Sequence, residues 1–420
     1  MSPVPTPMET ISATTEHDVS AAGLIPWGDP AFWQNPHPVL AALREKHRTA
    51  RTDTGQLAVL RWEDAEWAIR GHDFINEGIE RLEARGFRPG DPLHAWRSHA
   101  LGIMEGPDHT RIRKLVTGAM SRRNMEPLRP LIRGIAARLI ERLPRTGAVD
   151  IQRDFTSQLP RLVMMEFLGI GADELMGSMG PLADARLADC FGQNVTPQMR
   201  DKANGAIRMV MDHVASLYEK RRREPRDDLL SSLLEAHDER GTISMPELIT
   251  LFSTIFGSGS TTAASLDAGL LELAQHPEQQ ALLRSDPGRW KRGVCEETLR
   301  MHPGIAEMPQ KAAHDFEAFG HSFRRNDTIM IPLHAPNRDP RRWQDPEEFR
   351  ITRDPDVWHL SFGIGAHFCL GQAMARYTIE EALAVFVERC RWFELAQRPQ
   401  WEPCVMENRL RSLALNVVMD

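Results

Sequence analysis

Cysteine is scarce in this chain of 420 residues. The five cysteines form no CxxC pair and no regular framework; they are Cys190, Cys295, Cys369, Cys390 and Cys404. Such a sparse, odd set excludes a disulfide scaffold and is typical of a reducing cytoplasm, where a thiol is buried, reactive or a metal ligand. We therefore expect a cytoplasmic protein whose fold does not depend on disulfide bonds.

Long apolar runs and an excess of basic residues are also missing. No run approaches the roughly 18 apolar residues of a membrane-spanning helix, and the first residues lack the pattern of a secretory signal. Lys and Arg number 51 against 58 Asp and Glu, a net charge of −7, which argues against a nucleic-acid surface. What is present is an ordinary globular composition, 41% hydrophobic and 26% charged, that can bury a large core. We expect neither a membrane nor nucleic acid as a partner.

The patterns along the chain predict a mainly α fold with minor β. Residues 1–25 are polar and rich in Pro, Ser and Thr, which indicates a flexible tail, and residues 26–420 are expected to form a single domain. Apolar residues recur at helical spacing through most of residues 112–299. One long helix is predicted over residues 244–275, where Ser244 and Glu247 have capping-box spacing. The other predicted elements include a strand-turn-strand at 51–62, strands at 312–320, 327–336 and 411–419, and a last long helix at 370–390.

The segment from Ser361 to Arg376, SFGIGAHFCLGQAMAR, carries the sharpest chemical signal. Gly363 and Gly365 permit a tight turn with close backbone approach, and Cys369 follows at the predicted start of a helix. The backbone N–H groups of the first helical turn and the helix dipole favour a thiolate over a thiol. A thiolate held by amides in a glycine-lined turn is what an axial ligand to haem iron requires. A buried structural cysteine is the plainer interpretation of a lone Cys, and the whole string argues against it.

This segment resembles the haem-binding signature of the cytochrome P450 family, because Phe362-Gly-x-Gly-x-His-x-Cys369-x-Gly371 matches that signature at every fixed position. Glu297 and Arg300, which share a helix face at i, i+3, resemble the family's ExxR pair. Two further stretches support the resemblance. Residues 337–349 are similar to the family's meander, and residues 104–116 are similar to the start of its C-helix. The resemblance implies a cytochrome P450 fold, with haem b (iron protoporphyrin IX) between a long central helix and the Cys-loop helix.

The resemblance also implies a set of haem contacts. The iron ligand is Cys369, the residues beside the haem include Phe362, Gly365 and Gly257, and the propionates are bound by His109, Arg113 and His367. Two carboxylates in a half-buried pocket need cationic and hydrogen-bonding partners, and His109 and Arg113 lie on one helix face at i, i+4. A solvated surface pair is the plainer alternative for those two residues.

The chain departs from the family pattern after the ExxR helix. The family usually has a further propionate-binding Arg on a strand there, and this chain has Gln310, with Lys311 next to it. The Lys311 side chain is expected on the other face of that strand. Haem affinity or redox tuning is therefore expected to differ.

A second departure lies in the central helix, at GSGSTT over residues 257–262. The family usually has an acid before the threonine, and here Ser260 precedes Thr261. By resemblance, Thr261 hydrogen-bonds dioxygen and the acid brings protons; a serine hydroxyl can join a water chain but cannot supply a proton at neutral pH. Ser260 and Thr261 are the expected catalytic residues. In order of preference, the missing acid is explained by a water relay along these hydroxyls, by help from a substrate group, or by peroxide use or another non-standard outcome. A glycine in a helix interior costs roughly 1 kcal/mol of stability relative to alanine. A local bulge over the iron, or packing against the porphyrin, would explain Gly257 and Gly259 in this helix.

By resemblance, five stretches of the chain line the substrate pocket. Their candidate wall residues are Phe74, Phe87, Trp96, Phe191, Ile255, Met308 and Met406. This mix suggests a small apolar or aromatic substrate. For each residue taken singly, packing in the core is the plainer alternative.

Because the similarity takes up nearly the whole chain, electrons are expected from outside, through a ferredoxin and an NAD(P)H-dependent reductase. Arg341, Arg342 and Arg376 are candidates to steer this encounter. The expected protein is a monomeric P450 monooxygenase of the soluble bacterial type that inserts one O₂-derived oxygen by hydroxylation or oxidative O-dealkylation. Ser260 keeps open a peroxide-using enzyme or one that catalyses coupling or rearrangement. A haem-based gas sensor or haem carrier is the alternative without turnover.

Overall fold

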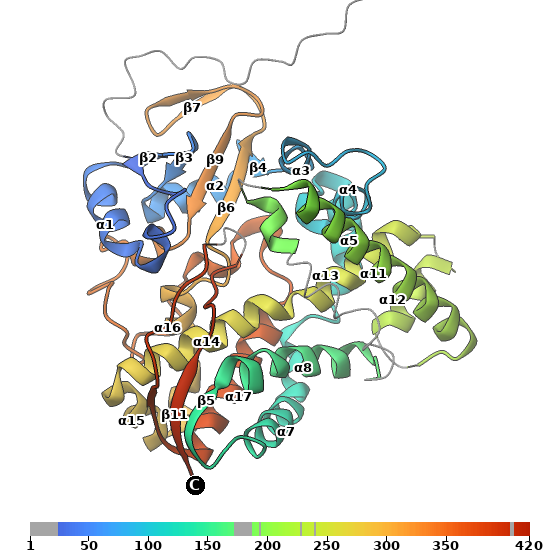
Figure 1. Cartoon of the computed structure of the whole chain (residues 1–420). Coiled ribbons are helices and arrows are strands. Elements are labelled where there is room, and N and C mark those ends of the chain that lie inside the picture. Colours follow the sequence, from blue (N-terminus) through green and yellow to red (C-terminus); the bar gives the residue numbers. More distant parts are fainter. Residues whose placement is uncertain (1–23, 172–186, 193–194, 227–228, 239–240, 404–406) are drawn as a thin grey trace, which may run out of the picture.

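A computed structural model describes residues 24–171, 187–192, 195–226, 229–238, 241–403 and 407–420 (Figure 1). Helix makes up 55% of the structure and strand 13%, which confirms the predicted mainly α fold with minor β. Residues 1–23 of the predicted tail lie outside the described residues. Leu24 and Ile25, also assigned to the tail, instead form strand β1, which pairs with β2. Within the described ranges, no helix has the length and apolar character needed to cross a membrane.

The helices occupy most of the stretch that the apolar spacing predicted. In chain order the α-helices are α1 (His37–Lys46), α2 (Trp62–Arg70), α3 (Glu80–Ala84), α4 (Pro92–Ser98), α5 (Gly106–Thr117), α6 (Arg122–Met125), α7 (Arg129–Ile140), α8 (Gln158–Leu168), α11 (Pro197–Arg223), α12 (Leu229–Asp238), α13 (Met245–Gly257), α14 (Gly259–Gln275), α15 (Pro277–Ser285), α16 (Pro287–Met301) and α17 (Gln372–Arg389). Helix α17 packs against α7, α14 and α16. The largest hydrophobic cluster lies among these helices.

The strands of the described residues form three small sheets. In chain order they are β1 (Leu24–Ile25), β2 (Thr49–Thr52), β3 (Leu57–Val59), β4 (Phe74–Asn76), β5 (Thr146–Asp150), β6 (Glu307–Ala312), β7 (Phe316–Ala318), β8 (His321–Phe323), β9 (Thr328–Pro332), β10 (Cys390–Leu395) and β11 (Ala414–Met419). The largest sheet has the order β1-β2-β3-β9-β6-β4, and the others are β10-β11-β5 and β7-β8. The predicted strand-turn-strand is confirmed as β2 and β3, which pair antiparallel through a turn that contains Gly55 at φ +89°.

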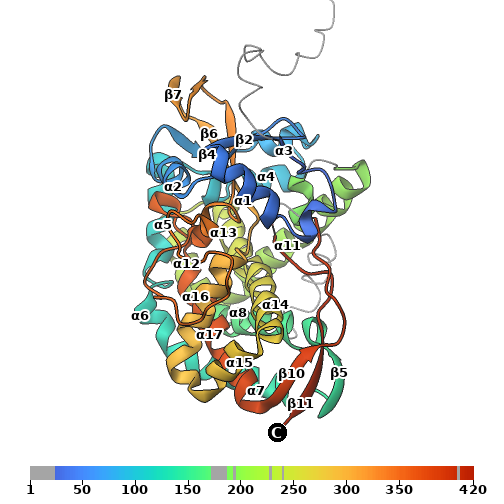
Figure 2. The same cartoon turned by 90° about the vertical axis from the view of Figure 1, so that its left-hand side faces the viewer.

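The largest sheet and the helical body lie at opposite ends of the molecule, with α13 and α14 running across the middle (Figures 1 and 2). The sheet of β5, β10 and β11 lies at the far end of the helical body, beside α7. Strand β5 was not predicted. Its sequence, Thr-Gly-Ala-Val-Asp, has little apolar alternation of its own, and it is held by pairing with β11, as at Val149 opposite Leu415.

The long helix predicted from Ser244 to Gln275 is divided in two at Ser258. The capping box at its start is confirmed, since the Ser244 side chain accepts from the Glu247 amide and the Glu247 carboxylate accepts from the Ser244 amide. At the break, the Ser258 hydroxyl donates to the carbonyl of Ile255 at 2.7 Å. Hydroxyls that donate to carbonyls of the preceding turn compete with backbone amides and bend helices, and the glycines on either side of Ser258 add backbone freedom.

Candidate functional site

The Cys loop is a compact turn between β9 and α17 whose shape depends on two glycines. Gly363 has φ +64° and Gly365 has φ +74°, in the left-handed region that favours glycine. A Cβ built at Gly363 would lie 3.3 Å from Cε of Met308. A residue with a side chain would therefore crowd Met308 at this position. The Cys369 amide donates to the carbonyl of Phe362 at 2.9 Å. This bond closes the loop and sets Cys369 three residues before α17, which begins at Gln372 and not at the cysteine itself as predicted.

The Cys369 thiol lies where two opposing effects act on its pKa. Burial raises the pKa of the thiol, while the backbone amides of Gly371 and Gln372 and the guanidinium groups of Arg376 and Arg113 lower it, and the net shift is upward. The side chain nevertheless has accessible surface, as expected for an atom in the wall of a hollow. The predicted amide donors are therefore present, and a cation at the sulfur would stabilise the thiolate against the cost of burial.

Three of the predicted residues form one cluster of nitrogen-bearing side chains beside this loop. The rings of His109 on α5 and His367 on the Cys loop lie 4.2 Å apart, and Arg113 donates to the carbonyl of Phe368. Burial, His367 and Arg113 lower the pKa of His109. The Nε2 atoms of His109 and His367 are both buried without a hydrogen-bond partner among the described residues, although Nε2 of His367 lies 3.2 Å from Oε1 of Glu105. The cluster offers donors suited to a carboxylate ligand.

Gln310 and Lys311 both have protein partners. The Gln310 amide donates to Oδ1 of Asn76 at 2.7 Å, and Nζ of Lys311 lies 2.5 Å from Oε1 of Glu80. The neighbouring side chains thus bond to different partners, and Lys311 is held in an ion pair with Glu80. In this structure it does not join the His109 cluster.

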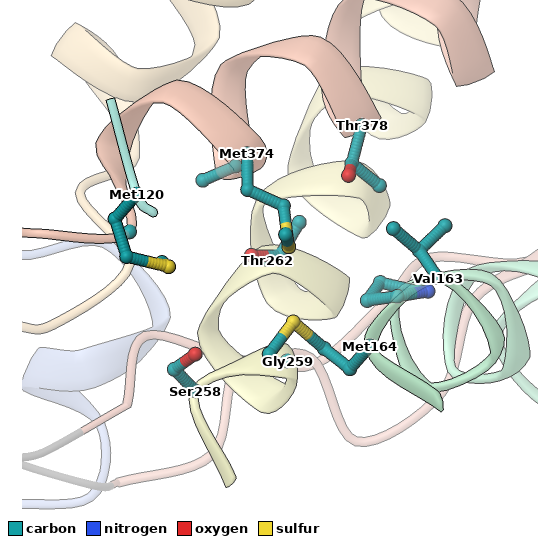
Figure 3. A pocket seen from close by; sticks show the side chains of 11 residues that line it. Met120, Val163, Met164, Ser258, Gly259, Thr262, Met374 and Thr378 are labelled. Atoms are coloured by element: carbon teal, nitrogen blue, oxygen red, sulfur yellow. The ribbon is translucent and has the colours of Figure 1, made fainter. Parts of the chain in front are cut away.

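The break between α13 and α14 faces the first turns of α17 across a small cavity of about 20 Å³. Its lining consists of Met120, Pro160, Val163, Met164, Ser258, Gly259, Thr262, Gly371, Met374, Ala375 and Thr378. Figure 3 shows Met374 and Thr378 of α17 facing Gly259 and Thr262 of α14. The cavity is large enough for about one water molecule. The helix break and the first turns of α17, more than 100 residues apart in sequence, therefore lie against each other.

At the helix break, the structure brings Ser260 to an acid that the sequence did not reveal. The Ser260 hydroxyl lies 2.7 Å from Oε1 of Glu407 and 3.3 Å from the carbonyl of Gly257. Thr261, the neighbouring residue, donates to the carbonyl of Ser258 at 3.0 Å. Glu407 follows Ser260 by 147 positions and stands in no recognisable motif, so no local signal could have found it.

The family model described as Cytochrome P450 matches residues 185–287 and 292–411. The chain belongs to the cytochrome P450 family. It is 30% identical over 401 residues to the Bacillus subtilis (strain 168) protein named Polyketide biosynthesis cytochrome P450 PksS, covering 92% of this chain and 96% of that one. It is 33% identical over 378 residues to the Vitamin D(3) 25-hydroxylase of Pseudonocardia autotrophica, covering 87% of each chain.

The fold agrees with this assignment. The crystal structure of CalO2 matches with a TM-score of 0.87 and 28% identity, over 94% of this chain and 99% of that chain. As a cytochrome P450, the protein is an oxidoreductase that binds haem b. The residues present fit this group: the unpartnered Nε2 of His109 and the Arg113 guanidinium suit its carboxylates, and the amide-lined Cys369 sulfur suits its iron.

Most of the residues predicted to line the P450 substrate pocket lie in the core. Phe74 is buried among Phe316 and Phe323, with ring centroids 5.0 and 5.2 Å away, and Phe87 and Phe191 pack in another buried cluster. Phe74, Phe87 and Phe191 are core residues, because aromatic and aliphatic side chains from other elements surround them. The remaining candidates have different surroundings. Trp96 donates to Ser253 at 2.7 Å, Ile255 lies in the main core, Met308 lies over Gly363, and Met406 lies outside the described residues.

One of the three arginines predicted to meet a P450 redox partner points inward. Nε of Arg376 lies 2.5 Å from Oε1 of Glu296, and its guanidinium lies 4.4 Å from the Phe362 ring centroid. Arg376 is thus occupied within the Cys-loop scaffold. Arg341 and Arg342 are exposed and keep the predicted role open.

Proposed function

We propose that this cytochrome P450 inserts one oxygen atom of O₂ into an apolar organic molecule, by hydroxylation or oxidative O-dealkylation, with Cys369 as the iron ligand. The observation that carries the proposal is the position of Cys369, on an amide-lined turn that leads into the helix facing the α13–α14 break. A thiolate ligand below a site and hydroxyl groups above it are the parts that oxygen activation by a P450 needs.

When bound, haem b supplies the redox chemistry that activates O₂. The residues of this chain then have separate tasks. His109, Arg113 and His367 would hold the carboxylates of the cofactor, and Phe362, which the Arg376 guanidinium contacts, would line its site. Thr261 holds a proton at the helix break, and Ser260 links that break to its carboxylate partner.

The proposed substrate is an apolar molecule of natural-product size. The names of the relatives support this class: besides the polyketide-biosynthesis and vitamin D(3) enzymes, they include a luteothin monooxygenase and a 6-deoxyerythronolide B hydroxylase. Met308, beside Gly363 of the Cys loop, would supply an apolar wall. Because an apolar pocket gains affinity mainly from buried area, a ligand with an extensive hydrocarbon surface fits it best.

The proposed electron donor is a small acidic ferredoxin served by an NAD(P)H-dependent reductase. A surface groove of about 480 Å³ lies beside the Cys loop; its lining includes Trp62, Glu66, Arg70, Arg342, Trp358 and Phe368. The Arg342 guanidinium lies 4.8 Å from the Trp62 ring, and Trp358 is 55% exposed. Positive and aromatic groups at the rim of such a groove favour an acidic protein partner.

The ligand assignment is tested by the spectrum of the reduced protein with carbon monoxide. We expect the red-shifted band of a thiolate-ligated haem in the wild type and its loss in Cys369→Ser, because a serine oxygen does not replace the thiolate as a donor. Cys190→Ala is the matched control: burial raises the pKa of that thiol to about 11, it lies in a separate core cluster, and the band should persist. A wild-type spectrum of a histidine-ligated haem would refute the proposal.

The conventional O₂ route is proposed over peroxide use because of what lies beside Ser260. The absence of an acid at this position was the reason to consider a peroxide-using enzyme. The carboxylate of Glu407 at 2.7 Å from the Ser260 hydroxyl returns an acid to the same place, which weakens that reason.

A further inference from the structure

We propose that Glu407 serves as the acid that the central helix lacks, and that it passes protons to the helix break through the Ser260 hydroxyl. This inference rests on the proposed function and names a residue that acts through Ser260. It starts from a single contact, the 2.7 Å hydrogen bond between the Ser260 hydroxyl and Oε1 of Glu407. An acid bonded to the serine performs the task that an acid at residue 260 itself would otherwise perform.

A glycine on a third segment allows the Glu407 loop to reach the helix. Gly304 lies so close to α14 that a Cβ on it would stand 3.2 Å from Cβ of Thr261 and 3.5 Å from the Ser265 hydroxyl. The Asn408 amide donates to the carbonyl of Gly304 at 3.0 Å. This backbone bond anchors the loop beside Thr261 and leaves the preceding residue, Glu407, at Ser260.

The other oxygen of the Glu407 carboxylate is fixed by Arg409. Nη1 of Arg409 lies 2.6 Å from Oε2 of Glu407, and the same guanidinium pairs with Glu402 at 2.6 Å and with Asp189 at 3.4 Å. The Glu407 side chain is 15% exposed and that of Arg409 19%. The carboxylate is therefore held in one orientation by a guanidinium, yet remains in contact with the solvent from which it can regain a proton.

The Ser260 hydroxyl has two acceptors within reach, so it can turn from one to the other. In the structure it donates to Glu407, and the carbonyl of Gly257 lies 3.3 Å away on the other side. When Glu407 carries a proton, it donates that proton to the Ser260 oxygen, and the hydroxyl releases its own proton to a water molecule at the helix break. Glu407 is left as a carboxylate and takes up a proton from solvent. One proton crosses, and no group is oxidised or reduced.

The test measures the rate at which the reduced protein returns to its ferric spectrum after it is mixed with O₂, which is the probe. The rate is measured in H₂O and in D₂O, across pH 6 to 8.5. Glu407→Gln keeps the size of the side chain and an acceptor oxygen for Ser260 but cannot exchange a proton. We expect its rate to fall at least tenfold and to lose the pH dependence of the wild type. Glu402→Gln is the matched control, because Glu402 pairs with the same Arg409 and should leave the rate within twofold.

Two further variants separate a proton relay from a structural clamp. Ser260→Ala removes the link and leaves the Arg409 cluster intact, so its rate should fall as far as that of Glu407→Gln. If Glu407→Gln does not fold, Ser260→Ala decides the outcome. Ser260→Asp in the Glu407→Gln background returns an acid to the helix and should restore the rate and its pH dependence. Ser260→Asp alone places two carboxylates in contact and should give no gain, because like charges repel.

Each failure has its own signature. The inference is overturned if Glu407→Gln keeps the wild-type rate, or if the rate falls equally in Glu402→Gln. In either case the carbon monoxide band of every variant would still be that of a thiolate-ligated haem, so the proposed function would stand. If the wild type itself lacks that band, the proposed function fails first.

Discussion

Glu297 and Arg300 show how burial changes the meaning of a single pair of residues. The pair makes two hydrogen bonds, of 2.7 and 2.9 Å, and the two side chains are only 2% and 1% exposed. Arg300 also donates to the carbonyls of Asn337 and Pro346 at 3.0 and 2.8 Å. Glu297 accepts from Nε of Arg353 at 2.9 Å. An ExxR spacing that is common on helix surfaces thus ties α16 to the long loop that leads to Cys369.

Glu297→Gln is expected to destabilise the protein, because it leaves two guanidinium groups buried beside a neutral amide. Breaking a buried pair by removing one partner costs about 3–5 kcal/mol. The free energy of unfolding, measured with a chemical denaturant, should fall by this amount. Glu66→Gln is the control, since its ion pair with Arg70 is exposed and should contribute less than about 1 kcal/mol. Equal losses in both variants would contradict this account.

At the scale of the element, two helical glycines have opposite reasons for being there. Gly257 ends α13, and a Cβ built on it would meet nothing within 4 Å. Gly293 lies inside α16, where a Cβ would come within 2.0 Å of the carbonyl oxygen of Ile351. Helix propensity disfavours both glycines equally. Only packing distinguishes them, because a Cβ meets no protein atom at Gly257 and collides with the Ile351 backbone at Gly293.

The two alanine substitutions should therefore shift stability in opposite directions. In the haem-free protein, Gly257→Ala should raise the free energy of unfolding by up to about 1 kcal/mol, because alanine is the better helix former and no protein atom is in its way. Gly293→Ala should lower it by about 1–3 kcal/mol, because the Ile351 backbone must move away. Denaturant midpoints measured side by side decide the matter, and shifts of the same sign would refute the packing argument.

At the scale of the whole molecule, Asp267 joins three distant parts of the chain. This residue of α14 accepts from Gln152 at 2.7 Å and from Thr156, and Gln152 also donates to the carbonyl of Leu410 at 3.1 Å. Burial raises the pKa of Asp267 from its ordinary 3.8 to about 7, although both hydrogen bonds oppose the shift. The folded protein therefore holds a proton that the unfolded chain releases.

The raised pKa of Asp267 predicts that stability falls as the pH rises from about 4 to about 7. In that window the native state binds more protons than the unfolded state, so the slope is negative and reaches at most about 1.4 kcal/mol per pH unit for one group. Asp267→Asn should flatten the curve and exceed the wild type in stability at pH 8. Unfolding free energies at pH 5, 6, 7 and 8 test this; curves that stay parallel would contradict it. Asp154→Asn, which removes a half-buried carboxylate paired with the exposed Arg153, is the control.

Short-range features of the fold and site could be predicted because they depend on neighbours in sequence. The Cys369 turn, the capping box at Ser244 and the clustering of His109 with Arg113 follow from glycine torsions, backbone amides and helical spacing. These constraints act within a few residues, so the spacing alone specifies the geometry. The resemblance then placed His367 in the same cluster, and the structure brings the three residues together.

Long-range features were decided by the tertiary structure alone. The contact between Ser260 and Glu407, the pairing of β5 with β11 and the burial of Phe74 among other aromatic rings join segments far apart in the chain. Their free energy comes from surface buried between elements, which no local pattern records. The sequence by itself determined the family, the helical framework and the Cys369 turn; the folded chain decided which acid stands at the helix break and which apolar side chains form the core.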